Sequence, residues 1–254
     1  MNDYFKKLLM RTLTIVLFLL FWETSVWLGL INKIYISCPS DIFKDFIEFY
    51  ASGELMRHSL ITLKEAALGL FFGTLSGIIL AFILSYFKFL GQIFEPVIAA
   101  LNSIPQLTLA PLYILWFGIG LTSKVFMSSI MAFFLIFFAT YGGIKNVGKE
   151  MEEAAQLLGA NDFKIIYKVI FPLCIPWIIS GLKGGIGAAL VGAIVGEYLG
   201  ASAGIGWMIS FATSYYNIKR VMTCLLLMLI AGSVFLKILD IMEKRALRYQ
   251  DRTN

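Results

Sequence analysis

The amino-acid sequence predicts an all-α polytopic membrane protein with about six spans. Hydrophobic residues make up 59% of the 254 residues, and charged residues only 15%. The mean hydropathy is +0.83. A soluble domain of this composition would expose more apolar surface than water tolerates. The charged residues gather in short segments between long apolar runs, as expected when the runs cross a bilayer.

The first span is expected from about Thr12 to Ile31, behind a basic segment that contains Lys6 and Lys7. At ~1.5 Å per residue, this run can cross the ~30 Å of hydrocarbon in a bilayer. Its length, with Glu23 inside it, argues against a cleaved signal peptide. Glu23 is interpreted as a carboxyl group that faces other helices, with a substrate or ion ligand as the alternative.

Residues 32–64 mix charged and aromatic side chains, which is typical of an outer loop with an interfacial helix. His58, the only histidine, has no neighbouring cysteine or histidine in the sequence, so a packing role is expected rather than a metal site. The three cysteines fall on an expected outer loop, an inner loop and a span, which predicts no disulfide: Cys38, Cys174 and Cys224.

Span two is expected from about Glu65 to Phe87. Small residues occupy every fourth position of it and would let another helix approach closely: Gly69, Gly73, Gly77 and Ala81. Residues 88–96 are expected to form a short inner turn.

Span three, from about Val97 to Phe117, contains polar side chains and two prolines within the bilayer. Since Pro105 and Pro111 lack a backbone donor, the helix should be kinked and should face protein or a water-filled path. Its polar side chains are therefore path candidates: Asn102, Gln106 and Thr108.

Span four, residues 125–144, carries no charge and is rich in phenylalanine, methionine and isoleucine, so a lipid-facing position is expected. Span five, residues 177–199, has small residues at helical spacing, which predicts close packing against another helix or a narrow route. Glu197 near the outer end of span five is the fourth path candidate, with a structural hydrogen bond as the alternative.

Residues 202–217 combine glycines and aromatic residues, as a re-entrant or surface helix does, and span six is expected from Val221 to Ile241. Lysine and arginine are more frequent in the segments that this topology places inside, which predicts that both termini are cytoplasmic. The expected organisation is a cytoplasmic N-terminus (1–11), one transmembrane domain (12–241) and a cytoplasmic tail (242–254).

The longest polar stretch between spans covers residues 145–176 and is called the polar segment below. Apolar residues recur in it at helical spacing, with charged residues between them. Gly159 and Asn161 mark a turn between two short helices. The topology places this segment in the cytoplasm, where it is the stretch best suited to contact a soluble partner.

The polar segment contains a spaced pattern that begins with Glu153, Ala154 and Ala155 and continues with Gly159, Val169, Phe171 and Pro172. It resembles the EAA loop of permease subunits of binding-protein-dependent ABC importers, EAA-x3-G-x9-I-x-L-P. The spacing agrees throughout, with Val169 in place of Ile and Phe171 in place of Leu. Residues 95–120 and 181–209 are similar to the nitrate, sulfonate and taurine branch of these permeases.

The resemblance implies a type I ABC importer transmembrane domain in the bacterial cytoplasmic (inner) membrane. The implied partners are ABC ATPase subunits, an extracytoplasmic solute-binding protein and a second copy of this chain. The seven matching residues would couple transport to the ATPase, which would bind ATP and Mg²⁺, so no cofactor is expected in this chain. The implied cargo is a small nutrient such as nitrate, a sulfonate or taurine, or a heterocyclic vitamin precursor.

Other functions are less well supported by the residues. The sequence has no Gly-rich GK[ST] loop for ATP, no HExxH and no GxSxG, so neither an ATPase site nor catalytic or metal-ligating residues are expected. A secondary transporter is the alternative function, but the sequence shows no convincing internal repeat. The basic residues lie in short loops between spans, which argues against nucleic-acid binding.

Overall fold

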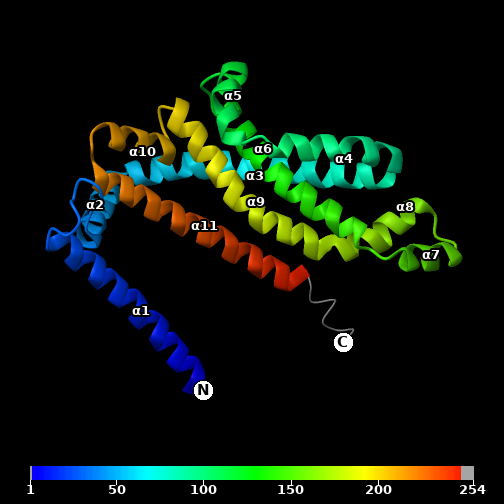
Figure 1. Ribbon diagram of the computed structural model, residues 1–254, viewed down its shortest axis with the longest axis horizontal. Helices are drawn as coiled ribbons and strands as arrows, with labels where there is room; N and C mark the ends of the chain where they lie inside the picture. Colours follow the sequence, from blue (N-terminus) through cyan, green and yellow to red (C-terminus); the bar gives the residue numbers. More distant parts are fainter. Residues whose placement is uncertain (1, 247–254) are drawn as a thin grey trace.

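The computed structural model describes residues 2–246, and this range is almost entirely helical (Figure 1), which confirms the predicted all-α class. The helices run in the order α1 (Asn2–Trp27), α2 (Pro39–Ala51), α3 (Glu54–Tyr86), α4 (Lys88–Ser103), α5 (Ala110–Phe117), α6 (Leu121–Lys145), α7 (Lys149–Leu157), α8 (Asp162–Ile165), α9 (Phe171–Gly200), α10 (Ile205–Ser214) and α11 (Ile218–Ala246). A 3₁₀ turn (Gln106–Leu109) precedes α5, and a π turn (Ile166–Ile170) joins α8 to α9.

The described residues contain five helical stretches that are long and apolar enough to cross a membrane. A sixth span results if the bent pair of α4 with residues 106–117 is counted as one. The prediction of about six spans is therefore confirmed. The predicted cytoplasmic tail lies partly outside the described residues, since only residues 242–246 of it are described, and they continue α11.

Helix α6 is the centre of the bundle, because α3 and α9 both pack along its length. Ala132, Ile136 and Phe137 of α6 are fully buried. The prediction that span four is lipid-facing is wrong. An uncharged aromatic sequence fits lipid and a protein interior equally well, so hydropathy alone cannot separate the two positions.

Glycines on the two neighbouring helices allow this close packing. A Cβ at Gly69 of α3 would overlap the side chain of Ser128, and one at Gly73 would lie 2.6 Å from the Ser129 carbonyl oxygen. A Cβ at Gly192 of α9 would lie 2.7 Å from the Ser128 Cα. The small-residue stripes predicted for spans two and five therefore serve helix packing around α6.

Several element boundaries differ from the predictions, among them the starts of α1, α3, α4 and α9. Helix α3 begins at Glu54, so residues 54–64 extend the span and do not belong to a loop. Residues 88–96 are the first part of α4 and not a turn. In both cases amphipathic residues form the first turns of a helix ahead of its most apolar part, so hydropathy places the start of the helix too late in the sequence.

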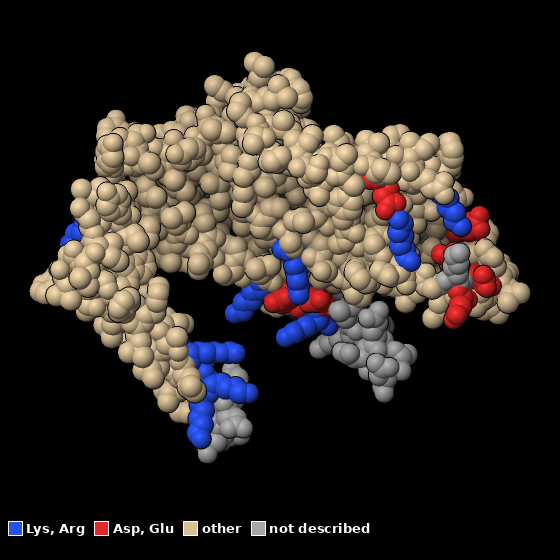
Figure 2. All heavy atoms as spheres, in the orientation of Figure 1, with Lys and Arg blue, Asp and Glu red and all other residues tan. Residues whose placement is uncertain are grey.

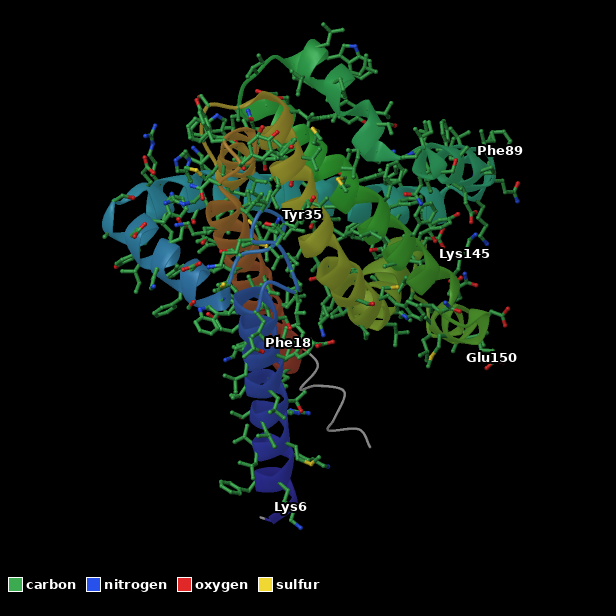
Figure 3. All side chains as sticks on the ribbon, turned by 60° about the vertical axis from the view of Figure 1, so that its left-hand side comes forward. Lys6, Phe18, Tyr35, Phe89, Lys145 and Glu150 are labelled. Atoms are coloured by element: carbon green, nitrogen blue, oxygen red, sulfur yellow. The ribbon has the colours of Figure 1, made fainter. Side chains whose placement is uncertain are left out.

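The bundle has two distinct ends (Figure 1). Helices α2 and α10 lie at one end, and α7 and α8 lie at the other; we call these the α10 end and the α7 end. Helix α1 projects away from the bundle, with Lys6 near its free end (Figure 3). Its other end is held by Glu23, which accepts hydrogen bonds from the Ser40 backbone N–H (3.0 Å) and hydroxyl (2.7 Å).

Candidate functional site

The two short helices of the polar segment are joined by a tight turn. Helix α7 ends in a Schellman-type pair of hydrogen bonds, from Gly159 N to the Gln156 oxygen (2.9 Å) and from Ala160 N to the Ala155 oxygen (3.0 Å). Gly159 has a φ of +80°, a conformation that residues with a Cβ rarely adopt. The Asn161 side chain then caps α8 by accepting a hydrogen bond from Lys164 N at 3.0 Å.

Large apolar side chains project from the polar segment, of which residues 146–161 lie between two candidate spans. Leu157 and Leu158 are each 89% exposed, and Phe163 is 75% exposed. Exposed apolar side chains grouped on one segment mark a surface for another protein or for lipid. The sequence pattern draws attention to Glu153 and Gly159, but the most exposed apolar side chains, Leu157 and Leu158, lie between them in the sequence.

The residues of the EAA-like pattern divide into two groups. Glu153, Ala154 and Gly159 are exposed on α7 and its turn, where a partner can reach them, and Ala155 is half-buried. Val169 packs against the core, and the Phe171 ring lies 5.9 Å from that of Phe82. Pro172 lies in the first turn of α9. The downstream half of the pattern thus anchors the segment to the bundle.

Helix α8, the π turn and α9 form one continuous helical stretch of 39 residues. Single π turns inside helices are frequent at functional sites. Because α9 packs against both α6 and α3, a displacement of α8 would be carried directly into the centre of the bundle.

The charged side chains on the face drawn in Figure 2 lie mainly near the α7 end, at the last turns of α11 and on the free end of α1. The first of these groups contains an ion pair. This pair joins α6 to α4, with Lys145 Nζ 2.7 Å and 2.8 Å from the two Glu95 oxygens. The Tyr141 hydroxyl donates a further hydrogen bond to Glu95 Oε2 at 3.3 Å. These contacts fix the start of the bent span relative to the polar segment.

The bent span turns by 79° between α4 and residues 106–117. Gln106 bridges the break: its side-chain nitrogen donates to the Leu101 and Ile104 oxygens at 3.1 Å, and its oxygen accepts from the Tyr113 hydroxyl at 2.9 Å. Asn102 is exposed, and the exposed Thr108 donates to the Pro105 oxygen at 2.7 Å. The proline-rich sequence predicts a kink, and the structure confirms it as a complete break.

The fourth path candidate, Glu197, lies in a different environment from the other three. Its carboxylate is fully buried and accepts hydrogen bonds from the Thr62 hydroxyl (2.7 Å) and from Gly206 N (2.7 Å). His58 Nδ1 accepts from Gly204 N at 2.9 Å, and Thr62 accepts from Ile205 N at 2.8 Å. This geometry favours the structural hydrogen bond that was the alternative for Glu197.

We call this group of residues, with the buried Glu65, the α10 clamp, because α3 and α9 use it to hold the first turn of α10. Gly204 has a φ of +108°, and a Cβ there would overlap the Glu197 carboxylate. Sequence reasoning placed Glu65 at the start of span two and His58 in a loop, so it missed the clamp. The sequence feature that could have indicated the clamp is the presence of His58, Glu65 and Glu197 in or beside otherwise apolar runs.

The fold and these sites can be set beside known proteins. A family model described as the binding-protein-dependent transport system inner membrane component matches residues 73–248. The putative aliphatic sulfonates transport permease SsuC of Bacillus subtilis is 29% identical over 91% of this chain and 83% of its own length. The riboflavin transport system permease RibX of Chloroflexus aurantiacus is 33% identical over 60% of this chain and 57% of its own.

Among solved structures, an inward-facing conformation of the MetNI methionine ABC transporter contains a similar chain. The TM-score is 0.66, and the match covers 76% of this chain and 96% of that one. The sequence identity is 21%, so this likeness concerns the fold.

Proposed function

Since the chain belongs to the binding-protein-dependent transport system inner membrane components, we propose that its polar segment couples ATP hydrolysis to the import of a small organic anion or nitrogen heterocycle. The chain is the permease subunit of a bacterial inner-membrane ABC importer. In this family the ATPase is a separate subunit, and an extracytoplasmic binding protein delivers the solute. The family assignment displaces the secondary transporter that the sequence left as the alternative.

One observation carries the coupling role of the polar segment. It presents exposed apolar side chains, among them Leu157 and Leu158 at the end of α7, next to α8, which runs without interruption into α9. A group of exposed apolar side chains outside the membrane marks a surface that gains stability when a partner covers it. The ATPase is the partner that an ABC permease requires, and ATP and Mg²⁺ bind to that subunit.

The mechanism that this geometry supports is a two-state switch. Closure of the ATPase on ATP moves α7 and α8, and the continuous helix carries that movement into α9 and its packing against α6 and α3. The bent span, with the exposed Asn102 and Thr108 beside its break, borders the route that opens and closes. Because each chain supplies one polar segment, two copies serve two ATPase subunits.

The proposed cargo rests on the relatives. SsuC is named for aliphatic sulfonates and RibX for riboflavin. A small organic anion and a nitrogen heterocycle are therefore the two cargo classes to test first. Selectivity between them lies mainly in the binding protein, because the path candidates Asn102 and Thr108 carry no charge with which to select an anion.

The test is co-purification of the chain with its ATPase from detergent, combined with uptake by proteoliposomes that contain ATP and the binding protein. Wild type should give a two-to-two complex and ATP-dependent uptake of a sulfonate or of riboflavin. Glu153→Ala and Gly159→Asp should weaken the complex while the chain remains folded. A chain that purifies alone and whose transport ignores ATP would refute the proposal.

A further inference from the structure

A cavity of about 540 Å³ lies between the polar segment and the membrane helices. The ends of α3, α4 and α6 line one side of it, and α7 and α8 line the other side. Its volume falls within the ~300–1,000 Å³ of typical small-molecule sites. The coupling role of the polar segment does not use this space.

The walls of the cavity bring polar groups of both signs together. Tyr86, Lys88 and Gln92 come from the α3–α4 corner, and Glu152 and Asp162 come from α7 and α8. Glu95 and Lys145 also line the cavity, but they form an ion pair with each other at 2.7 Å. That pair therefore contributes little net charge to a ligand.

Three charged side chains remain for a ligand. Among the side chains that the structure describes, Lys88, Glu152 and Asp162 form no ion pair with one another or with other residues. The uncommitted charge is thus one cation at the α4 wall and two carboxylates on the opposite side. A ligand with an anionic group and a cationic group matches this distribution.

The cavity also lies where lipid headgroups are found. Lys88 follows directly after the last residues of the α3 span, and Lys145 ends the α6 span. Aromatic and aliphatic side chains such as Phe82, Ile166 and Ile170 form its apolar part. A polar cavity with an apolar wall, at the end of two spans, suits an amphiphile at the membrane interface.

We propose that this cavity binds a zwitterion with a primary ammonium and a phosphate, the chemistry of an ethanolamine phospholipid headgroup. The ammonium is held by Glu152 and Asp162, and the phosphate by Lys88 with Gln92 as a further donor. A primary ammonium offers three hydrogen-bond donors to the carboxylates, whereas a choline headgroup offers none. The cavity therefore distinguishes ethanolamine from choline lipids.

The test is native mass spectrometry of the full chain in complex with its ATPase, titrated with ethanolamine, choline and glycerol phospholipids of identical acyl chains. Ethanolamine lipid should bind about tenfold more tightly than either other lipid, the factor expected from one charge-assisted hydrogen bond. Lys88→Gln and the double variant Glu152→Gln with Asp162→Asn should both remove this preference. Each variant must co-purify with the ATPase as wild type does.

The control for the change at Glu152 is Glu150→Gln, which removes one carboxylate from the same helix, α7. Glu150 is exposed on α7 at the periphery of the molecule (Figure 3) and does not line the cavity. This variant should keep the preference. Equal binding of all three lipids by wild type, or the same loss in Glu150→Gln as in the double variant, would overturn the proposal.

A competition arm identifies the source of the headgroup. Soluble phosphoethanolamine is added to the complex in choline-lipid nanodiscs and then chased with ethanolamine lipid. Retention of the soluble compound would identify a free zwitterion as the ligand, whereas binding of the lipid alone would identify the membrane as the source.

Discussion

The Thr62 hydroxyl donates a hydrogen bond of 2.7 Å to the carboxylate of Glu197, 135 residues later in the chain. The same hydroxyl oxygen accepts from Ile205 N at 2.8 Å, so one side chain of α3 links α9 to the first turn of α10. Both side chains are almost completely buried. A buried polar group stabilises a membrane bundle only while its partners are in place, which makes this contact the centre of the α10 clamp.

Thr62→Val should lower the free energy of unfolding by about 1–3 kcal/mol, since it leaves a buried carboxylate short of a donor and Ile205 N–H without its acceptor. Denaturant unfolding in detergent measures the change. Thr213→Val is the control, because Thr213 is exposed and its hydroxyl bonds only to the Ile209 oxygen within α10. Equal losses in the two variants would show that the clamp contributes no more than an ordinary helix hydroxyl.

Gly192→Ala should separate α6 from α9, because its Cβ would lie 2.7 Å from the Ser128 Cα. We expect a loss of about 1–3 kcal/mol, the usual effect of overpacking. Gly187→Ala on the same helix is the matched control: no atom lies within 4 Å of its Cβ position, and alanine favours the helix. Thermal unfolding of the purified chain should therefore shift down for the first variant and stay level or rise for the second.

Much of this packing could be predicted from the sequence. A small residue at every fourth position of α9 indicates a helix interface directly, and the spaced pattern around Glu153 and Gly159 identifies the polar segment. Both signals depend on residues close together in the chain. Local periodicity is therefore sufficient to find them.

The central position of α6 and the α10 clamp could not be predicted in this way. Phe137 is fully buried, yet the uncharged apolar sequence around it is typical of a lipid-facing helix. Glu197 and His58 come together only when α3, α9 and α10 pack against one another. Because these residues are far apart in the sequence, no local pattern predicts that contact. The prolines predict a kink, but neither the angle of 79° nor the hydrogen bonds of Gln106 across the break follow from their spacing.

Two ion pairs of similar length should differ in their contribution to stability. Asp45 and Arg220 join α2 to α11 at 2.9 Å with side chains only 5% and 17% exposed, and the guanidinium lies 4.0 Å from the centre of the Phe49 ring. Lys145 and Glu95 meet at 2.7 Å but are 53% and 37% exposed. Burial prevents water from replacing a lost partner, so the Asp45–Arg220 pair should contribute more to the free energy of unfolding.

Asp45→Asn should therefore lower the free energy of unfolding by about 3 kcal/mol or more, whereas Glu95→Gln should cost no more than about 1 kcal/mol. Denaturant unfolding at low and high salt measures both. High salt should reduce the loss in the free energy of unfolding caused by Glu95→Gln. It should leave the loss caused by Asp45→Asn nearly unchanged. A larger loss in Glu95→Gln would contradict this ranking.

Leu158→Asp should uncouple transport from ATP. Leu158 is 89% exposed beside Gly159, so a carboxylate there faces water in the isolated chain but would be buried without a partner once the ATPase docks. The isolated variant should unfold like wild type, while ATP-driven uptake in proteoliposomes should fall at least about tenfold, as expected for a central interface residue. Leu158→Met keeps the apolar surface and should retain uptake. Full uptake by Leu158→Asp would place the docking surface elsewhere, whereas a loss in both variants would indicate a requirement for leucine itself rather than for an apolar contact.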